Sequence, residues 1–537
     1  MRQIAWSALV LIALGESCWG GVALRLHGNG IHWRQPQISL KISRTVHLAG
    51  SDLGVDARDT AAGVHATVVD AIHQWVKAGE GAVKIDVELT DAQQVSPGQN
   101  LVTFTDPAPF DNGTCNKDVM VACALVNFDP GSGELLSASI AFNPYKRHSA
   151  IGMAGTNDIG LVMLHEVGHV LGLDHTPLTD AVMSAAAEME TSGVKGGHYA
   201  PRRLTSDDTL TLRSLYGDTS ALGRLHGRIL QHGQPVWNAH VMAMTPDGLP
   251  VYSAQTDQAG QYSLLLPAGS YHLLAEPQDG PTLVAGPVFP TVFWTASGGH
   301  ALERDGIDLS EAETKVGLDF AVGDGLTLNL PHIGLRANGR YVGYPRTVVA
   351  RGRNYDLGMG RTPPGTPGQV RVVGSKIEID GDPVMPASGP GFVFQRIKVP
   401  EDTLLGAYTV QFHTDSVGAV AAGAVRVAPN PQIESVGPAE GEPGEPFIAG
   451  QQIVLTGKDL AAGEAKGERW SDGAPLQTQL EGTVVLVGDV YAQLVSVHPE
   501  RIVLIVPTLP GTENAPIRVM TGIGVESNVL EVKLTVQ

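Results

Sequence analysis

Three histidines and one glutamate stand at spacings that suit metal chemistry in the stretch LHEVGHVLGLDH. His165 and His169 are four residues apart, so on a helix both imidazoles project from one face and can bind one ion. Gly172 tolerates the positive φ that ends a helix, which lets the chain turn back and bring His175 to that ion from outside the helix. Glu166 lies beside the first ligand and can reach a metal-bound water without binding the metal.

The ion that this arrangement predicts is one catalytic zinc. Three neutral imidazoles leave a dipositive zinc with a fourth position open for water. The charge lowers the pKa of that water from about 15.7 towards 7, and Glu166 is placed to take the proton as general base and pass it to a departing amine. The alternative is that these are ordinary helix and loop residues, because a bare HExxH occurs by chance. The extended motif in an apolar helix favours zinc.

The pattern HExxHxxGxxH resembles the signature of the metzincin metalloproteases, and HEVGHVLGLDHT is most similar to the matrixin branch. The resemblance extends over about residues 30–218. It implies an α+β catalytic domain with a mixed twisted sheet and three helices, a zinc bound by three residues, and a general base, Glu166. The zinc ligands that it implies are His165, His169 and His175.

Two further segments carry the resemblance. Met183 follows His175 by eight residues, where metzincins have the Met-turn beneath the zinc. RLTSDDTLTLRSLYG is similar to the matrixin C-terminal helix with its paired aspartates, which in the family brace the Met-turn. By resemblance Asp207 and Asp208 take that role, although acids at a helix N-terminus are favourable in any case. The resemblance also makes VMVACALVNF the edge strand to which a substrate adds as an antiparallel strand.

The chain departs from the matrixin pattern in several places. The strands VACALVNF and SASIAFN lack the histidine of the family's structural zinc, so a second zinc is not expected. Between them, Asp129 and Glu134 of FDPGSGE are candidates for calcium binding together with glycine carbonyls, or part of a plain glycine-rich hairpin turn. No PRCGxPD-like segment is present, so a thiolate-blocked latent form is not expected. Residues 185–203 match no family segment, and there His198 and Tyr199 are candidates for touching substrate.

The elements that must position these residues can be read from periodicity. Val64, Val68, Ala71, Ile72 and Trp75 recur at helical spacing in GVHATVVDAIHQWVKA. The segments QISLKIS, VKIDVELT, LVTFTD, VMVACALVNF and LLSASIAFN have the composition of strands. A second helix runs through the zinc motif, and the candidates for its N-cap are Thr156, Asn157 and Asp158.

A third helix is expected in LTSDDTLTLRSLYG, where Thr205 and Asp208 can form a capping box. After Gly217 the sequence pattern becomes that of strands and turns. Residues 222–325 resemble a prealbumin-like or carboxypeptidase-regulatory β-sandwich, with the turn TDQAGQY before two strands.

From residue 326 the chain repeats itself at an offset of about a hundred residues, the size of a β-sandwich. YPRTVVARGRNYDLG parallels AGQQIVLTGKDLAAG, and FQRIKVP parallels ERIVLIVP. Residues 429–537 resemble an IPT/TIG immunoglobulin-like module, and residues 326–428 are a looser match. We therefore expect a multidomain protein with a zinc domain over residues 23–218 and about three all-β sandwich domains behind it. By analogy the rear modules are spacers or bind a surface, the matrix or substrate.

Composition bounds the remaining possibilities. The 537 residues carry a formal net charge of −19, which argues against a nucleic-acid partner because phosphates would be repelled. Residues 1–22 have an arginine, a short apolar run and small residues, the pattern of a secretory signal peptide, and no later stretch is long and apolar enough to span a membrane. With Cys18 removed with the signal, Cys115 and Cys123 remain; in an exported protein they suggest a disulfide, and two buried thiols are the alternative.

These features favour a secreted or periplasmic zinc endopeptidase that cleaves extended protein or peptide substrates. One alternative is an extracellular adhesion or binding protein whose metzincin-like domain has little activity. Retention of Glu166 with all three zinc ligands favours the enzyme. A second alternative is hydrolysis of a non-peptide amide or ester, which would use the same zinc chemistry.

Overall fold

The structure is a computed structural model that describes residues 22–535 with gaps. The gaps are residues 27–28, 50–53, 57–58, 119, 152–154, 185–201, 277–301, 324–325, 330–332, 338–339, 345, 361–367, 386–391, 415–416, 441–445, 468–476, 489, 510 and 523. The predicted signal peptide therefore lies outside the described residues except for its last residue, and His198 and Tyr199 lie outside them as well. Among the described helices, none combines the length and apolar character that crossing a membrane requires.

The N-terminal region is an α+β unit built on one mixed sheet. Its strand order is β6-β3-β7-β9-β8, in which β6, β3, β7 and β9 run parallel and β8 pairs antiparallel with β9. The strands of this region are β1 (Arg25–Leu26), β2 (Asn29–Gly30), β3 (Gln37–Ser43), β4 (Leu48–Ala49), β5 (Gly54–Asp56), β6 (Lys84–Thr90), β7 (Leu101–Thr103), β8 (Ala122–Phe128), β9 (Leu135–Phe142), β10 (Arg147–Ser149) and β11 (Asn157–Asp158). The mixed sheet that the resemblance implied is present, and β8 lies at its edge.

Four helices accompany this sheet: α1 (Ala61–Ala78), α2 (Ala108–Asp111), α3 (Ile159–Val170) and α4 (Ser206–Tyr216). The five apolar residues predicted at helical spacing in α1 are all buried, and Trp75 is fully enclosed. Burying a side chain of the size of valine or isoleucine contributes roughly 1.5–3 kcal/mol. The one-turn helix α2 was not expected; the Asp106 carboxylate accepts a hydrogen bond from the Ala108 amide at 3.0 Å and starts this turn.

Beyond α4 the described chain is all β and forms three pairs of sheets, each pair sharing one apolar core. The first pair, here called the 223–322 sandwich, contains β12 (Gly223–Gln231), β13 (Gln234–Pro235), β14 (His240–Met244), β15 (Pro250–Gln255), β16 (Gln261–Leu266), β17 (Gly269–Glu276), β18 (Leu302–Leu309), β19 (Thr314–Lys315) and β20 (Phe320–Val322). A mostly-β continuation behind the zinc motif is thus what the structure shows.

The second pair, the 326–428 sandwich, contains β21 (Leu326–Asn329), β22 (Ile333–Ala337), β23 (Arg340–Tyr344), β24 (Thr347–Ala350), β25 (Arg353–Gly360), β26 (Gln369–Val372), β27 (Glu378–Ile379), β28 (Phe392–Val399), β29 (Gly406–His413) and β30 (Val417–Ala428). The third pair, the 432–533 sandwich, contains β31 (Gln432–Pro438), β32 (Gln452–Lys458), β33 (Ala465–Lys466), β34 (Val484–Val487), β35 (Val490–Tyr491), β36 (Gln493–His498), β37 (Arg501–Ile505), β38 (Asn514–Gly522), β39 (Val525–Glu526) and β40 (Leu530–Lys533).

The two rear sandwiches share a strand pattern, but not in the register that the sequence suggested. The parallel of TVVARG with QIVLTG sets β24 against β32. In the structure β24 instead pairs parallel with β30. The corresponding contact in the 432–533 sandwich is the parallel bridge between Phe447 and Leu534. It is β25 that pairs with β28, as β32 pairs with β37. Both segments are short apolar runs, so composition alone does not separate a central strand from an edge strand.

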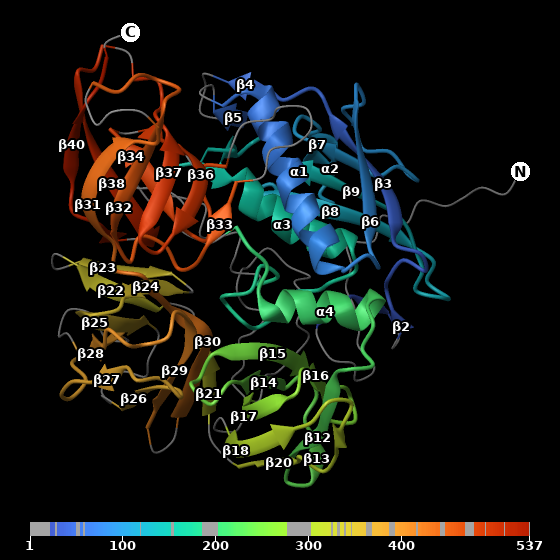
Figure 1. The fold of residues 1–537 in the computed structure, drawn as a ribbon. Coiled ribbons are helices and arrows are strands. Elements are labelled where there is room, and N and C mark those ends of the chain that lie inside the picture. Colours follow the sequence, from blue (N-terminus) through green and yellow to red (C-terminus); the bar gives the residue numbers. More distant parts are fainter. Residues whose placement is uncertain are drawn as a thin grey trace, which may run out of the picture.

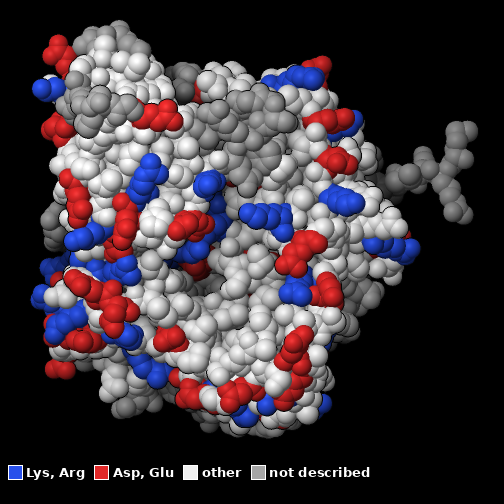
Figure 2. Space-filling view, in the orientation of Figure 1, with Lys and Arg blue, Asp and Glu red and all other residues white. Residues whose placement is uncertain are grey.

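The four units follow one another around a ring, and the last returns to the first (Figure 1). At the point of return Gln479 accepts a hydrogen bond from the Arg202 amide at 2.7 Å, and Gln477 bonds Asp70 of α1. The face in Figure 2 is hollowed near its middle, and acidic and basic side chains are interspersed over it. The rear sandwiches are therefore packed against the zinc-motif region and do not trail behind it.

The contact between α4 and the 223–322 sandwich buries a carboxyl group. Asp207 accepts hydrogen bonds from the Ser253 amide at 2.7 Å and from the Ser253 hydroxyl at 3.1 Å. Burial, together with the neighbouring Asp208 carboxylate, raises the pKa of Asp207 to about 7. Folding therefore favours protonated Asp207 near neutral pH.

We expect this group to make the fold less stable as pH rises. Its pKa is higher in the folded state than in the unfolded chain, so its stabilising contribution is complete below about pH 4 and is lost as pH rises through about 7. Asp207→Asn should reduce the loss of unfolding free energy between pH 5 and pH 8 by about 1 to 4 kcal/mol. Urea unfolding across this range measures it, with Asp118→Asn, at an exposed position, as control. An unchanged pH slope in Asp207→Asn would refute the assignment.

Candidate metal centre

The Nε2 atoms of three histidines converge on one point. The separations are 3.1 Å between His165 and His175, 3.1 Å between His169 and His165, and 3.2 Å between His169 and His175. Two nitrogens bound to one tetrahedral zinc, with bonds of 2.0–2.1 Å, lie about 3.3 Å apart. Among the described residues this is the only group of three or more histidine, cysteine or acidic side chains close enough to share a metal ion.

Helix α3 carries the first two of these histidines and starts at a firmly held cap. Of the three candidates it is Asp158 that caps the helix, accepting a hydrogen bond from the Leu161 amide at 3.0 Å. The same carboxylate pairs with Arg202 at 2.8 Å, and its side chain is 1% exposed. Asp158 thus holds the start of α3 and ties it to the segment that precedes α4.

The third histidine reaches the others because the chain reverses at Gly172, directly after the C-cap of α3. Gly172 has φ +88°, its amide donates to the His169 carbonyl at 3.0 Å, and the Leu173 amide donates to the Gly168 carbonyl at 2.9 Å. This pair of bonds is a Schellman motif, which reverses the chain at the end of the helix. A Cβ at position 172 would lie 2.3 Å from the Ile31 carbonyl oxygen. Both the backbone conformation and the space require glycine here.

Side chains from both ends of the unit satisfy the last carbonyls of α3. The Trp33 indole donates to the Val170 carbonyl at 2.8 Å, and the Tyr216 hydroxyl donates to the Leu171 carbonyl at 2.7 Å. Helices leave these carbonyls without partners of their own. The end of α3, from which the chain turns to the third histidine, is thereby held in place.

Backbone carbonyls orient two of the three imidazoles. Nδ1 of His165 donates to the Val182 carbonyl at 2.7 Å, and Nδ1 of His169 donates to the Leu173 carbonyl at 2.9 Å. Each of these two rings therefore carries its hydrogen on Nδ1 and presents a lone pair at Nε2. Nδ1 of His175 is buried and has no hydrogen-bond partner among the described residues.

Burial keeps these rings neutral. It lowers the pKa of His165 to about 3 and lowers the pKa of His169, and it places the pKa of His175 well below the ordinary value. Neighbouring imidazoles lower the pKa of His165 and His175 further. Three neutral rings whose lone pairs point at one another repel unless a cation lies between them. The donor set, its spacing and its protonation thus fit a zinc ion.

Met183 lies beneath the centre, packed against α3. A Cβ added to Gly168 would meet the Met183 sulfur at 2.1 Å and Trp75 at 3.1 Å, so a glycine between the two helical histidines lets the methionine approach. Asp208 accepts hydrogen bonds from the Val182 and Met183 amides, both at 3.0 Å.

Two roles were open for Asp207 and Asp208, namely bracing the turn at Met183 and stabilising the N-terminus of α4. Asp208 braces the turn at Met183 and also forms the capping box of α4 with Thr205. Asp207, by contrast, bonds Ser253 of the 223–322 sandwich and the side chain of Thr176. Glu166 is buried, 2% exposed, in α3 beside the first histidine.

The calcium interpretation of the FDPGSGE segment finds no support. One Asp129 oxygen accepts hydrogen bonds from the Gly131 and Ser132 amides, both at 2.8 Å, and Glu134 pairs with Arg34 at 3.0 Å. These bonds lower the pKa of Asp129. The segment is a hairpin turn between β8 and β9 in which Asp129 stabilises the turn and Glu134 pairs with Arg34, which precedes β3.

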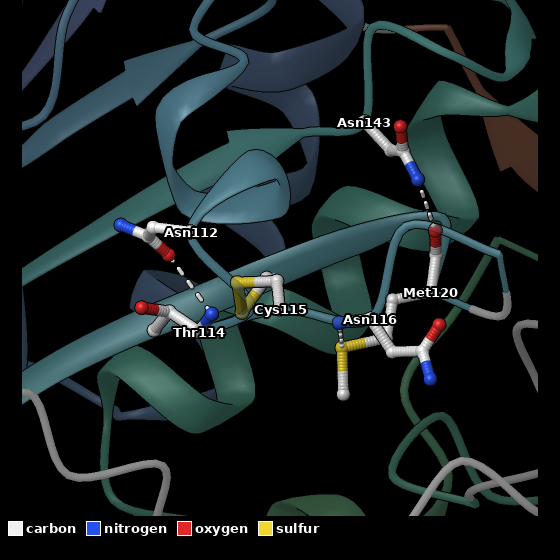
Figure 3. The surroundings of a disulfide bond; sticks show 7 residues. Asn112, Thr114, Cys115, Asn116, Met120 and Asn143 are labelled. Atoms are coloured by element: carbon white, nitrogen blue, oxygen red, sulfur yellow. Dashed lines mark hydrogen bonds between the residues drawn. A yellow bond between two sulfur atoms is a disulfide. The ribbon is translucent and has the colours of Figure 1, made fainter.

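A disulfide joins Cys115 to Cys123, which lies at the start of the edge strand β8 (Figure 3). Buried Asn143, at the end of β9, donates from its side-chain amide to the Met120 carbonyl at 2.7 Å and to the Lys117 carbonyl at 2.9 Å. The disulfide closes the loop and the asparagine ties it to the sheet. Together they hold the segment from which β8 starts.

Several residues of the centre gave no signal in the sequence. Trp33 and Tyr216 act on α3 from 137 and 45 residues away. Ser253 bonds Asp207 and Asp180 bonds Arg426, and both contacts join different units of the fold. Motif spacing reports only local geometry, so residues that meet through the fold are not visible to it.

Replacing Gly172 tests how the third histidine is delivered. Gly172→Ala should lower the free energy of unfolding by about 1–3 kcal/mol or more and abolish tight zinc binding, because the alanine Cβ meets a backbone carbonyl. Gly81→Ala is the matched control, since Gly81 also has positive φ, +89°, but open space around it. Urea unfolding and zinc titration measure both effects. Equal zinc affinity in the two variants would contradict this account.

Comparisons with known proteins bear on this region. The family model described as Matrixin, peptidase M10, matches residues 65–217. No curated protein shows significant sequence similarity to the chain.

Solved structures give only distant likenesses. SGBP-B of the Bacteroides ovatus mixed-linkage glucan utilization locus, in complex with a mixed-linkage heptasaccharide, is 13% identical with TM-score 0.17, over 56% of this chain and 61% of that one. Gamma-CGTase from an alkalophilic Bacillus clarkii is 20% identical with TM-score 0.14, over 34% of this chain and 23% of that one. The chain thus spans less than two thirds of either protein, and TM-scores this low carry no argument. The family match is informative. Residues 65–217 of this chain form a matrixin-like domain of the metalloprotease type.

Proposed function

We propose that the protein is an exported zinc-dependent endopeptidase that cleaves extended protein substrates. One observation carries the proposal: the Nε2 atoms of His165, His169 and His175 lie within 3.2 Å of one another, and Glu166 follows the first of them on the same helix. This is a donor set with a base beside it, as peptide hydrolysis by metal-activated water requires.

The residues divide the chemistry among them. Bound zinc would supply a Lewis acid that makes water acidic and polarises the scissile carbonyl. The histidines hold the ion, and their Nδ1 hydrogens, given to the Val182 and Leu173 carbonyls, keep two of the rings aimed at it. Glu166 accepts the proton of the attacking water and delivers it to the leaving amine.

The edge strand β8 supports an extended peptide as substrate. Among the described strands β8 pairs only with β9, so no described strand occupies its other edge. Helix α3 packs beside β8. A peptide that adds antiparallel to β8 would use main-chain hydrogen bonds for affinity and would lie along the helix that carries the candidate zinc ligands.

Export is part of the proposal. The first 22 residues have the composition of a signal peptide, and a disulfide such as Cys115–Cys123 persists in oxidising compartments. Secretion to the outside or to a periplasm agrees with both. The prealbumin-like and IPT/TIG-like assignments of the rear sandwiches, and their binding to a surface, matrix or substrate, remain predictions.

Replacing the base separates catalysis from metal binding. Glu166→Gln should lower kcat/KM for an unfolded protein substrate by about 10²–10⁴-fold, since a positioned general base contributes about that much, while zinc content stays at one per chain. Peptide mass spectrometry and elemental analysis provide the two readouts. If the variant cleaves as fast as the unaltered protein, Glu166 is not the base; if the unaltered protein cleaves nothing, a binding role is favoured.

Removing the metal tests the other half of the proposal. Dialysis against a strong zinc chelator should abolish peptide cleavage, and one equivalent of Zn²⁺ should restore it. The affinity for Zn²⁺ should persist to a lower pH than free imidazoles would allow, because burial lowers the pKa of all three rings, and that of His165 to about 3, so protons compete less for the nitrogens. Activity that survives complete zinc removal, verified by elemental analysis, would rule out the metalloprotease.

A further inference from the structure

The segment that follows the third histidine and contains Met183 packs against the 223–322 and 326–428 sandwiches. This segment, residues 176–184, is here called the ligand loop. Its Leu178 and Ala181 are buried in an apolar cluster. The other members come from β14 and β17 of the 223–322 sandwich and from the 326–428 sandwich: Met242, Met244, Leu274, Val373, Val420 and Ala422. The loop is therefore an interface between three units of the fold.

A buried charge cluster holds the middle of the ligand loop. Asp180 accepts a hydrogen bond from Arg426 of β30 and lies 3.7 Å from the Arg346 guanidinium, just before β24. The exposed fractions are 15% for the Asp180 side chain, 7% for Arg346 and 10% for Arg426. Arg346 also donates to the Thr179 carbonyl at 3.0 Å. Removing the carboxylate would leave two arginines without its compensating charge in a place with little access to water.

Backbone contacts flank this cluster on both sides. The Thr179 amide and hydroxyl both donate to the Ala422 carbonyl, at 3.0 Å and 2.7 Å. At the start of the loop the Thr176 hydroxyl lies 2.9 Å from the Ser253 hydroxyl of β15, which also bonds Asp207. The 326–428 sandwich thus holds the centre of the loop and the 223–322 sandwich holds its beginning.

From its inner side the same loop orients the metal centre. Its Val182 carbonyl accepts the Nδ1 hydrogen of His165 at 2.7 Å. Its Met183 packs against Gly168, between the two helical histidines. A shift of the loop by a fraction of an ångström would change the tilt of His165, and metal sites respond strongly to such outer contacts.

We propose that Asp180, together with Arg346 and Arg426, is a positioning residue for the zinc site, so that the 326–428 sandwich completes the metal centre of the matrixin-like domain. The inference rests on the proposed zinc site. It makes the rear module part of the catalytic apparatus, since a contact more than two hundred residues away in the chain fixes the carbonyl that orients the first ligand.

The test uses the full chain and two matched variants. Asp180→Asn removes the charge from the ligand loop. Asp459→Asn is the control. Asp459 forms a similar partly buried pair with Arg351, at 2.7 Å, and accepts a hydrogen bond from the Asn430 amide. Both contacts join the 326–428 and 432–533 sandwiches and lie outside the ligand loop. Zn²⁺ affinity is measured by competition with a chromophoric chelator, and the visible spectrum of the Co²⁺-loaded protein reports the ligand geometry.

Asp180→Asn should weaken Zn²⁺ binding at least about 10-fold and alter the Co²⁺ spectrum, the size of effect that outer contacts of a metal site have. Asp459→Asn should leave affinity within about twofold. Equal affinity and spectra for Asp180→Asn and the unaltered protein would overturn the proposal, and so would an equal loss in Asp459→Asn, which would indicate a general effect of loosened units.

A milder variant covers the case in which Asp180→Asn does not fold. Thr179→Val removes one hydrogen bond to the Ala422 carbonyl and keeps the side chain's shape. Weaker Zn²⁺ binding at an unchanged melting temperature supports the proposal, and unchanged binding contradicts it. If the unaltered chain binds no Zn²⁺, the zinc site itself is wrong and both proposals fail; if it binds Zn²⁺ normally and the Asp180 and Thr179 variants do too, only the positioning role fails.

Discussion

Three imidazole nitrogens facing one another within 3.2 Å are the constraint on which the rest of this region depends. Two of them come at no conformational cost, because residues four apart on a helix share a face. The third requires the helix to stop and the chain to reverse within six residues. Gly172 makes the reversal, and the indole of Trp33 and the hydroxyl of Tyr216 bond the carbonyls that the stopped helix leaves unpaired.

The centre is surrounded by buried polar groups that are satisfied across long distances in the chain. Asp208 bonds the turn at Met183, Asp207 bonds Ser253 of the next unit, and Asp180 meets two arginines of the one after it. A buried charge is costly unless it is paired, so each of these contacts favours one arrangement of the units over the alternatives. The ring seen in Figure 1 follows from several such contacts and from the shared apolar cluster around Leu178.

Much of the matrixin-like domain could be predicted from local pattern. The apolar spacing of α1, the strands of the mixed sheet and the capping box of α4 all depend on neighbours within a few residues, and the structure contains them. The prediction that failed involved a choice among partners. The repeat in the rear sandwiches was aligned on β24 when β25 occupies the matching place. For the acids of FDPGSGE both calcium binding and a plain hairpin turn were open, and their bonds to backbone amides and to Arg34 favour the turn.

The sequence by itself determined that two histidines share a helical face, that the helix ends at a glycine, and that an acid lies beside the first ligand, because helical periodicity and backbone sterics are local properties. Only the tertiary structure decided how the pair of aspartates divides its bonds and which side chains close the end of α3. It alone also placed the loop before Met183 against two β-sandwiches, hundreds of residues further along the chain. Those contacts depend on packing and on the burial of charge, which arise only when segments remote in sequence meet.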